Sequence, residues 1–157
     1  MRAHHLRPGV SHARKRAVRA MPGEGRIWYE AGLRFECTRC GRCCTGGSGY
    51  VWVTEQDVSR LAAEVGLDLD GFGRRYLRRV GERYALLETP RDGACVFLEG
   101  DHCGVYAARP SQCRHFPFWE SHLASEATWS AAARECEGIR DDAPLVGRDE
   151  IDSRRRE

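Results

Sequence analysis

The spacing of hydrophobic residues predicts two helices in the first half of the chain. The first begins with a capping box at residues 54–57 (Thr-Glu-Gln-Asp) and ends at Gly66. Its apolar face consists of Val58, Leu61, Ala62 and Val65. The second helix begins at Asp70, and its apolar face consists of Phe72, Tyr76, Leu77 and Val80. We interpret its other face as solvated rather than anion-binding; it carries Arg74, Arg75, Arg78 and Arg79.

Short strands separated by turns are predicted around these helices. Residues 50–53 form one strand, and residues 84–87 and 95–98 form two more, separated by a turn at residues 90–93 (Pro-Arg-Asp-Gly). Residues 99–101 make a tight turn that returns the chain to a cysteine. The fold class expected from this pattern is α+β, a small and loop-rich single domain.

The last third of the chain gives weaker signals. Pro110 starts a short turn or helix that carries Cys113. Residues 119–133 fit either a strand or a helix, and we favour a strand around the two tryptophans. The mixed charges of residues 148–157 predict a frayed tail.

Charge is distributed unevenly along the chain. Residues 1–20 carry six cations and no acid, whereas the remaining residues have 19 cations against 23 acids. We interpret residues 1–22 as a disordered basic leader that is dispensable or untranslated, with Met21 as the true start. The alternatives are an arm that binds phosphate backbones and an organellar transit peptide. Because the body is mildly acidic, its charge argues against a nucleic-acid partner.

Hydropathy excludes a membrane-spanning protein, since no window approaches the about 18 apolar residues that a span needs. No apolar stretch follows the basic N-terminus, so no secretory signal is expected either. We therefore expect a cytoplasmic protein without membrane insertion. In a reducing compartment, eight cysteines are expected to bind metal rather than form disulfides. Only 29 residues are Leu, Ile, Val or Phe, so the hydrophobic core is small. We expect the fold to need stabilisation from a source other than this core.

Four cysteines lie within eight residues, at Cys37, Cys40, Cys43 and Cys44. Two residues separate each of the first three, a spacing that lets thiolates converge on one centre, as in zinc knuckles and iron–sulfur loops. Disulfides among such crowded cysteines would be strained. We predict that Cys37, Cys40 and Cys43 are metal ligands. Cys44 either serves a second centre or is a structural or reactive thiol.

The second half of the chain supplies Cys95, Cys103, Cys113 and Cys136. The first two flank the predicted hairpin, which brings them close together in space. Eight thiolates suffice for two four-thiolate centres, or for one iron–sulfur cubane with spare thiols. A four-thiolate centre is anionic and needs compensating donors. Four arginines beside these cysteines are candidates, namely Arg39, Arg42, Arg109 and Arg114.

Histidines are weaker candidates for the site. His102 and His115 lie close to cysteines in sequence, so a Cys–His nucleophile pair is conceivable. We expect neither histidine to be a ligand, because eight thiols already exceed what one metal site requires. The sequence contains no serine nucleophile elbow, paired-carboxylate signature or P-loop.

These residues resemble the signature of the YkgJ-type cysteine-cluster family, which is described as chelating zinc or iron. The resemblance runs in order over about residues 33–140. The matching segments are Phe35-x-Cys-x-x-Cys-Gly-x-Cys-Cys44, Asp57, Cys95-x-Phe-Leu98, Cys103-x-x-Tyr106, Arg109-Pro-x-x-Cys-Arg114-x-Phe-Pro-Phe118 and Cys136-x-Gly-Ile139. The chain departs from the pattern after Ile139, where it is charged.

The resemblance implies a metal-binding domain over residues 23–147, with all eight cysteines as candidate ligands. Its metal is zinc or iron, the iron as single ions or as an iron–sulfur cluster. The same cysteine signature is similar to one in flagellin lysine-N-methylases, bacterial enzymes that use an iron–sulfur centre with S-adenosylmethionine. The alternative is therefore an iron–sulfur enzyme of redox or group-transfer type. In the binding-module hypothesis, the domain contacts another protein.

Overall fold

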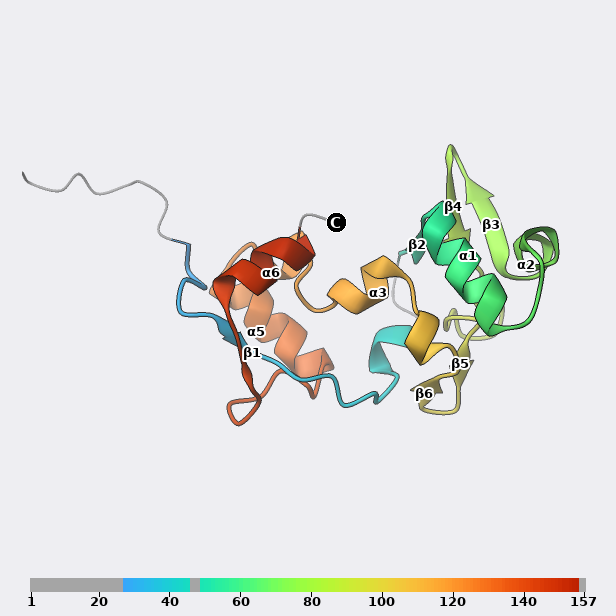
Figure 1. The fold of residues 1–157 in the computed structure, drawn as a ribbon. Helices are drawn as coiled ribbons and strands as arrows, with labels where there is room; N and C mark the ends of the chain where they lie inside the picture. Colours follow the sequence, from blue (N-terminus) through green and yellow to red (C-terminus); the bar gives the residue numbers. More distant parts are fainter. Residues whose placement is uncertain (1–26, 46–48, 156–157) are drawn as a thin grey trace, which may run out of the picture.

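Two hydrophobic clusters divide the molecule into two lobes (Figure 1). The structure is a computed structural model that describes residues 27–45 and 49–155; the predicted leader, residues 1–22, lies outside these residues. The central lobe comprises residues 50–108, and the terminal lobe combines residues 27–36 with residues 116–155. The chain passes between the lobes twice, through a first crossing at residues 37–45 and a second crossing at residues 109–115.

The central lobe packs two helices against a small antiparallel sheet. Leu61 and Phe72, fully buried, lie at the centre of its core. The sheet has the order β2-β4-β3. The elements of this lobe are β2 (Trp52–Val53), α1 (Glu55–Glu64), α2 (Leu69–Tyr76), β3 (Leu77–Val80), β4 (Arg83–Leu86), the hairpin of β5 (Leu98–Glu99) and β6 (His102–Cys103), and the 3-10 helix η2 (Tyr106–Ala108).

The terminal lobe joins the two ends of the described chain. Strand β1 (Leu33–Arg34) pairs antiparallel with β7 (Leu145–Val146). Phe118 and Trp129 stack in the core with ring centroids 5.7 Å apart. The helices of this lobe are α4 (Glu120–Leu123), α5 (Glu126–Glu135) and α6 (Arg148–Arg155), and the crossings carry the 3-10 helix η1 (Arg42–Cys44) and α3 (Ser111–His115).

The predicted fold class, a small α+β protein, is confirmed. The first helix also has the predicted capping box: Thr54 N donates to the Asp57 carboxylate at 2.9 Å, and Asp57 N donates to Thr54 Oγ1 at 3.1 Å. Within the described residues, none of the helices has the length and apolarity that a membrane crossing requires.

The second predicted helix is too long. Helix α2 is capped by Asp68 rather than Asp70 and ends at Tyr76. The following residues form β3, which pairs with β4 across the two-residue turn at positions 81–82. An arginine-rich segment can follow either a helical or a strand pattern, and here pairing with β4 decides it. Arg78 and Arg79 therefore belong to a strand and not to a helix face.

Three predictions for local structure are wrong. Residues 119–133 are helical, because a capping box of Ser125 and Thr128 starts α5 and buries Trp129 and Ala132 at helical spacing. The segment 95–98 contributes only an isolated bridge from Cys95 to Glu88 before β5 begins. Residues 148–155 are not a frayed tail but α6, which packs the fully buried Ile151 into the terminal core.

Asp57 ties the second crossing to the central lobe. It is the only charged side chain buried among the described residues, with 1% of its surface exposed. Its Oδ1 accepts from Ser111 N at 3.0 Å and from Ser111 Oγ at 3.1 Å, and it pairs with Arg60. Burial alone raises the pKa of this carboxyl, but the N–H groups of Thr54 and Ser111 bind its charged form and hold the pKa below the usual value. One carboxylate therefore caps α1 and anchors the start of α3.

Gln112 adds a second link between the same elements. Its Oε1 accepts from Trp52 N at 2.9 Å, and its Nε2 donates to Tyr50 O at 3.0 Å. The side-chain amide thus hydrogen-bonds backbone groups on the free edge of β2, as a neighbouring strand would. Together, Asp57 and Gln112 fix the position of α3 and of the cysteine that it carries.

We expect Asp57→Asn to lower the free energy of unfolding by about 2–4 kcal/mol near pH 7, because an amide turns a donor toward buried N–H groups. Denaturant unfolding measures this free energy. Asp68→Asn is the matched control, since Asp68 is the exposed N-cap residue of α2 and Asn is as good an N-cap residue as Asp.

The difference in unfolding free energy between the wild type and Asp57→Asn should decrease as the pH falls. The lowered pKa of Asp57 means that its contribution is complete above about pH 4 and is lost as the pH falls further. The stabilities of wild type and Asp57→Asn should therefore converge in acid. Equal losses in the Asp57 and Asp68 variants would contradict the proposed anchor.

Candidate metal centre

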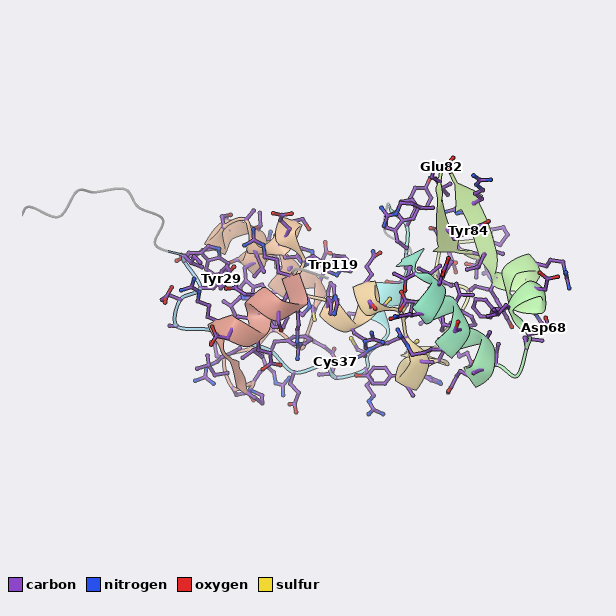
Figure 2. The ribbon with its side chains drawn as sticks, turned by 45° about the horizontal axis from the view of Figure 1, so that its top comes forward. Tyr29, Cys37, Asp68, Glu82, Tyr84 and Trp119 are labelled. Carbon is purple, nitrogen blue, oxygen red and sulfur yellow. The ribbon has the colours of Figure 1, made fainter. Side chains whose placement is uncertain are left out.

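All eight cysteines line one cavity of about 490 Å³ between the two lobes. They come from four separate parts of the chain. The first crossing supplies Cys37, Cys40, Cys43 and Cys44, the central lobe supplies Cys95 and Cys103, the second crossing supplies Cys113, and the terminal lobe supplies Cys136. All are free thiols. Figure 2 shows Cys37 on the segment that joins the lobes.

Two glycines allow the first crossing to lie close to both lobes. Gly41 has φ +67°, and a Cβ there would lie 2.4 Å from Asp101 O, so only glycine lets η1 press against the β5–β6 hairpin. At Gly138, a Cβ would lie 2.4 Å from Glu36 O. This second contact brings the turn after Cys136 against the start of the crossing. The glycines of the cysteine motifs therefore serve close packing.

The backbone also connects Cys44 to Cys95, because Cys95 N donates to Cys44 O at 2.8 Å. Cys95 lies in the loop before β5, and Cys103 lies at the end of β6 in the same hairpin. The predicted proximity of these two cysteines is confirmed by the cavity that both line.

Cys43, Cys44 and Cys103 form a hydrogen-bonded group. The hydrogen bond from Cys44 lowers the pKa of Cys103 to about 6 and that of Cys43 to about 7. The same bonds raise the pKa of Cys44, which holds its proton as the donor. Cys44 has one S–H proton and can donate to only one neighbour at a time. The three thiols therefore ionise as a coupled group.

The remaining thiols are harder to ionise. Burial, together with the smaller effects of the charges of Cys95, Cys43 and Cys103, raises the pKa of Cys113 to about 12. Burial also raises the pKa of Cys95. We name the mutually interacting thiols the inner set, which consists of Cys43, Cys44, Cys95, Cys103 and Cys113.

The other three thiols form an outer set, Cys37, Cys40 and Cys136. Burial raises the pKa of Cys136, with smaller contributions from Cys40 and Cys43. Cys37 is exposed and accepts a hydrogen bond from Arg109 Nη1 at 3.9 Å. Cys43, a member of the inner set, thus also affects the pKa of Cys136 in the outer set.

Arg109 is in direct contact with the thiols through its hydrogen bond to Cys37. Its guanidinium lies 3.8 Å from the ring centroid of Tyr106, donates to Cys37 and helps to lower the pKa of Cys43 and of Cys103. Arg39 contacts the same ring at 4.4 Å. Sequence reasoning gave no role to Tyr106, although it belongs to the Cys103-x-x-Tyr106 segment.

The other predicted arginines have different partners. Arg42 pairs with Glu137 at 3.8 Å, and Arg114 donates to Arg109 O at 3.1 Å and to Ser111 Oγ at 3.0 Å. Arg114 therefore braces the backbone of the second crossing. Within the part of the chain that the structure describes, only Arg109 of the four predicted arginines hydrogen-bonds a cysteine sulfur.

The two histidines differ in position. His115 lines the cysteine cavity at the end of α3. His102 is exposed, pairs with Asp101 at 3.4 Å and does not line the cavity.

The donor chemistry of the cavity fits zinc or iron. Within residues 27–45 and 49–155, no three His, Cys, Asp or Glu side chains are arranged so as to hold a metal ion as they stand. Eight thiols around one cavity nevertheless form a soft donor set of the kind that zinc and iron–sulfur clusters take. Metal binding therefore requires rotation of these side chains, and each thiol that becomes a ligand must lose its proton.

One family model matches residues 36–137, with the description "CxxCxxCC: Putative zinc- or iron-chelating domain". The match begins one residue before the first crossing and ends one residue after Cys136, so it includes all eight cysteines. It supports metal binding in general. No solved structure matches the chain.

We expect Cys103 to react with iodoacetamide at least about tenfold faster than Cys113 near pH 7, in metal-free protein that circular dichroism shows to be folded. A pKa of about 6 leaves Cys103 mostly thiolate at this pH, whereas a pKa of about 12 leaves Cys113 protonated. Peptide mass spectrometry over time measures both rates.

The control for this experiment is Cys44→Ala, which removes the hydrogen-bond donor. It should slow alkylation of Cys103 near pH 7, and the difference from the wild type should shrink as the pH rises past the ordinary thiol pKa, where both proteins carry the thiolate. Equal alkylation rates at Cys103 and Cys113 in the folded wild type would contradict the proposed difference in pKa between these two thiols.

Proposed function

Because the chain belongs to the CxxCxxCC family, whose description is zinc or iron chelation, we propose that it binds zinc or iron through the thiols of its interlobe cavity. The observation that carries this proposal is the convergence of all eight cysteines, from four parts of the chain, on one cavity. Buried thiols that serve only as small apolar residues do not need to meet in one place.

The inner set is the best candidate for the first centre. It offers five thiols, and a zinc ion or an iron–sulfur cluster takes four thiolates. Within this set, Cys43 and Cys103 ionise most readily, so they are the proposed first ligands. When bound, the metal supplies a cross-link between four thiolates.

Such a cross-link would join three parts of the fold. Cys43 and Cys44 lie in the first crossing, Cys95 and Cys103 in the central lobe, and Cys113 in the second crossing. The outer set extends the donor set toward the terminal lobe through Cys136. Arg109 lies between the two sets, where its charge offsets that of the thiolates.

An iron–sulfur enzyme is the second candidate, and one observation favours it. A second hollow of about 890 Å³ lies between the lobes and shares His115 and Arg154 with the cysteine cavity. Trp52, Tyr84 and Trp119 also line it. A substrate bound there would lie against α3, the helix that carries Cys113.

Anaerobic purification followed by elemental analysis and a visible spectrum distinguishes these functions. A colourless protein with stoichiometric zinc supports a zinc-binding module and excludes the iron–sulfur enzyme. A brown protein with iron and sulfide excludes the plain zinc module. A folded protein that binds neither metal after reconstitution would contradict the proposed function.

Replacement of Cys103 by Ser should remove more bound metal than replacement of Cys37 by Ser. Cys103 is a half-buried member of the inner set, whereas Cys37 is exposed at the cavity edge. Because metal binding and folding are coupled, Cys103→Ser should also lower the melting temperature of the loaded protein. The Cys37 variant is the matched control, and equal retention of metal in both variants would contradict the assignment.

A further inference from the structure

The 3-10 helix η1 and the β5–β6 hairpin are in close contact beside the inner set of thiols (Figure 1). Cys95 N donates a hydrogen bond to Cys44 O at 2.8 Å. Gly41 lets η1 approach the backbone of Asp101 in the turn of the hairpin. Cys103 lies on β6 of the same hairpin, where β6 pairs with β5. These backbone contacts bring Cys44 and Cys103 together from segments that are far apart in the sequence.

The side chains of these two residues are also in contact. The Cys44 thiol is hydrogen-bonded to the thiols of Cys103 and Cys43. A hydrogen bond between two thiols places their sulfur atoms side by side, so a covalent bond between them needs only rotation of the side chains. Cys44 and Cys103 are both half-buried and line the cavity, where a small molecule can reach them.

Cys103 is a better disulfide partner for Cys44 than Cys43 is. Adjacent residues have Cα atoms about 3.8 Å apart across a trans peptide bond, as between Cys43 and Cys44. An unstrained disulfide needs Cα atoms roughly 4.4–6.8 Å apart, so a bond between neighbouring cysteines is strained. Cys103 belongs to another segment of the chain and is free of this restriction.

The surroundings of Cys103 also favour nucleophilic attack. The hydrogen bond from Cys44 and, more weakly, the charge of Arg109 lower the pKa of Cys103. Cysteines that respond to oxidants are accessible, carry a thiolate and lie next to a second thiol. Cys43 and Cys103 both meet these conditions, but only Cys103 can form an unstrained bond with Cys44.

We propose that Cys103 and Cys44 form a site of reversible oxidation, which hydrogen peroxide converts to a disulfide in the metal-free protein. The sulfur of Cys103 attacks one peroxide oxygen, so that an S–O bond forms, the O–O bond breaks, hydroxide leaves and Cys103 becomes a sulfenic acid. The sulfur of Cys44 then attacks the sulfenic sulfur, forms the S–S bond and releases water that carries the Cys44 proton. The two sulfurs lose two electrons, and with one proton from solvent the peroxide becomes two water molecules.

This disulfide closes the inner set to metal, a consequence that rests on the proposed function. The inner set has five thiols, and a zinc ion or an iron–sulfur cluster takes four thiolates. Oxidation of Cys44 and Cys103 leaves Cys43, Cys95 and Cys113, which are too few for a four-thiolate centre. Metal loading of the inner set therefore depends on the redox state of one pair of thiols.

Peptide mapping tests the oxidation site in the absence of metal. Full-length, metal-free, reduced protein that circular dichroism shows to be folded is treated with a stoichiometric amount of hydrogen peroxide. Mass spectrometry without reduction then locates the disulfides, and the link between Cys44 and Cys103 should be the major product. A different major pair, such as Cys43 with Cys44, or no disulfide at Cys103, would overturn the proposal.

Two variants separate the attacking thiol from its partner. Cys44→Ser keeps a hydrogen-bond donor beside Cys103 but has no sulfur to link, so dimedone should trap Cys103 as the sulfenic acid. Cys37→Ser is the matched control, because it removes an exposed thiol of the outer set and should leave the disulfide between Cys44 and Cys103 intact. Dimedone labelling of another cysteine in place of Cys103 would contradict the assigned roles.

Zinc titration of the reduced and the oxidised wild type tests the consequence for metal loading. The oxidised protein should bind about one equivalent of zinc less than the reduced protein, and dithiothreitol should restore the difference. Equal zinc binding before and after oxidation would show that the disulfide does not control loading. If the reduced protein itself takes up no metal, the proposed function fails, whereas the mapped disulfide still decides the oxidation site.

Discussion

The buried carboxylate of Asp57 is the constraint on which the arrangement of this protein depends. Two small cores cannot by themselves fix how two crossing segments lie relative to each other. Asp57 does so for the second crossing, because it caps α1 through Thr54 and also accepts two hydrogen bonds from Ser111. A charge in this position is stable only while all its donors are present. The position of α3, and therefore of Cys113, depends on this group together with the Gln112 amide.

The thiols that line the cavity can ionise together only if their negative charges are offset. Five thiols of the inner set lie close enough to affect one another's ionisation, so each thiolate that forms makes the next less favourable. Two features counter this repulsion: the shared proton of Cys44 and the charge of Arg109. Arg109 follows η2 directly, and stacking on Tyr106 holds it beside the cavity. A lysine could supply the charge at this position but not the stacked, planar donor.

Local signals made part of this structure predictable, and long-range contacts decided the rest. The capping box at Thr54 was readable because its partners are three residues apart. The bond from Ser111 to the same carboxylate spans 54 residues and leaves no local pattern. Likewise, Ile151 is one apolar residue in a charged segment, and only its place in the terminal core makes a helix there stable. The closeness of the four cysteines at positions 37–44 was predictable from their spacing, whereas the contact of Arg109, and not of Arg42, with a cysteine sulfur depended on folding.

The terminal lobe is tied to the cavity less directly than the central lobe. Of the eight cysteines, only Cys136 comes from it, so a centre built from the inner set alone would leave this lobe without a metal link. Other contacts hold it: Glu36 N donates to Gly138 O at 3.0 Å, and Thr38 Oγ1 donates to Glu137 at 2.7 Å. These bonds pack the turn after Cys136 against the first crossing. The Cys136-x-Gly-Ile139 segment therefore helps to hold the terminal lobe against the first crossing, whether or not its thiol is a ligand.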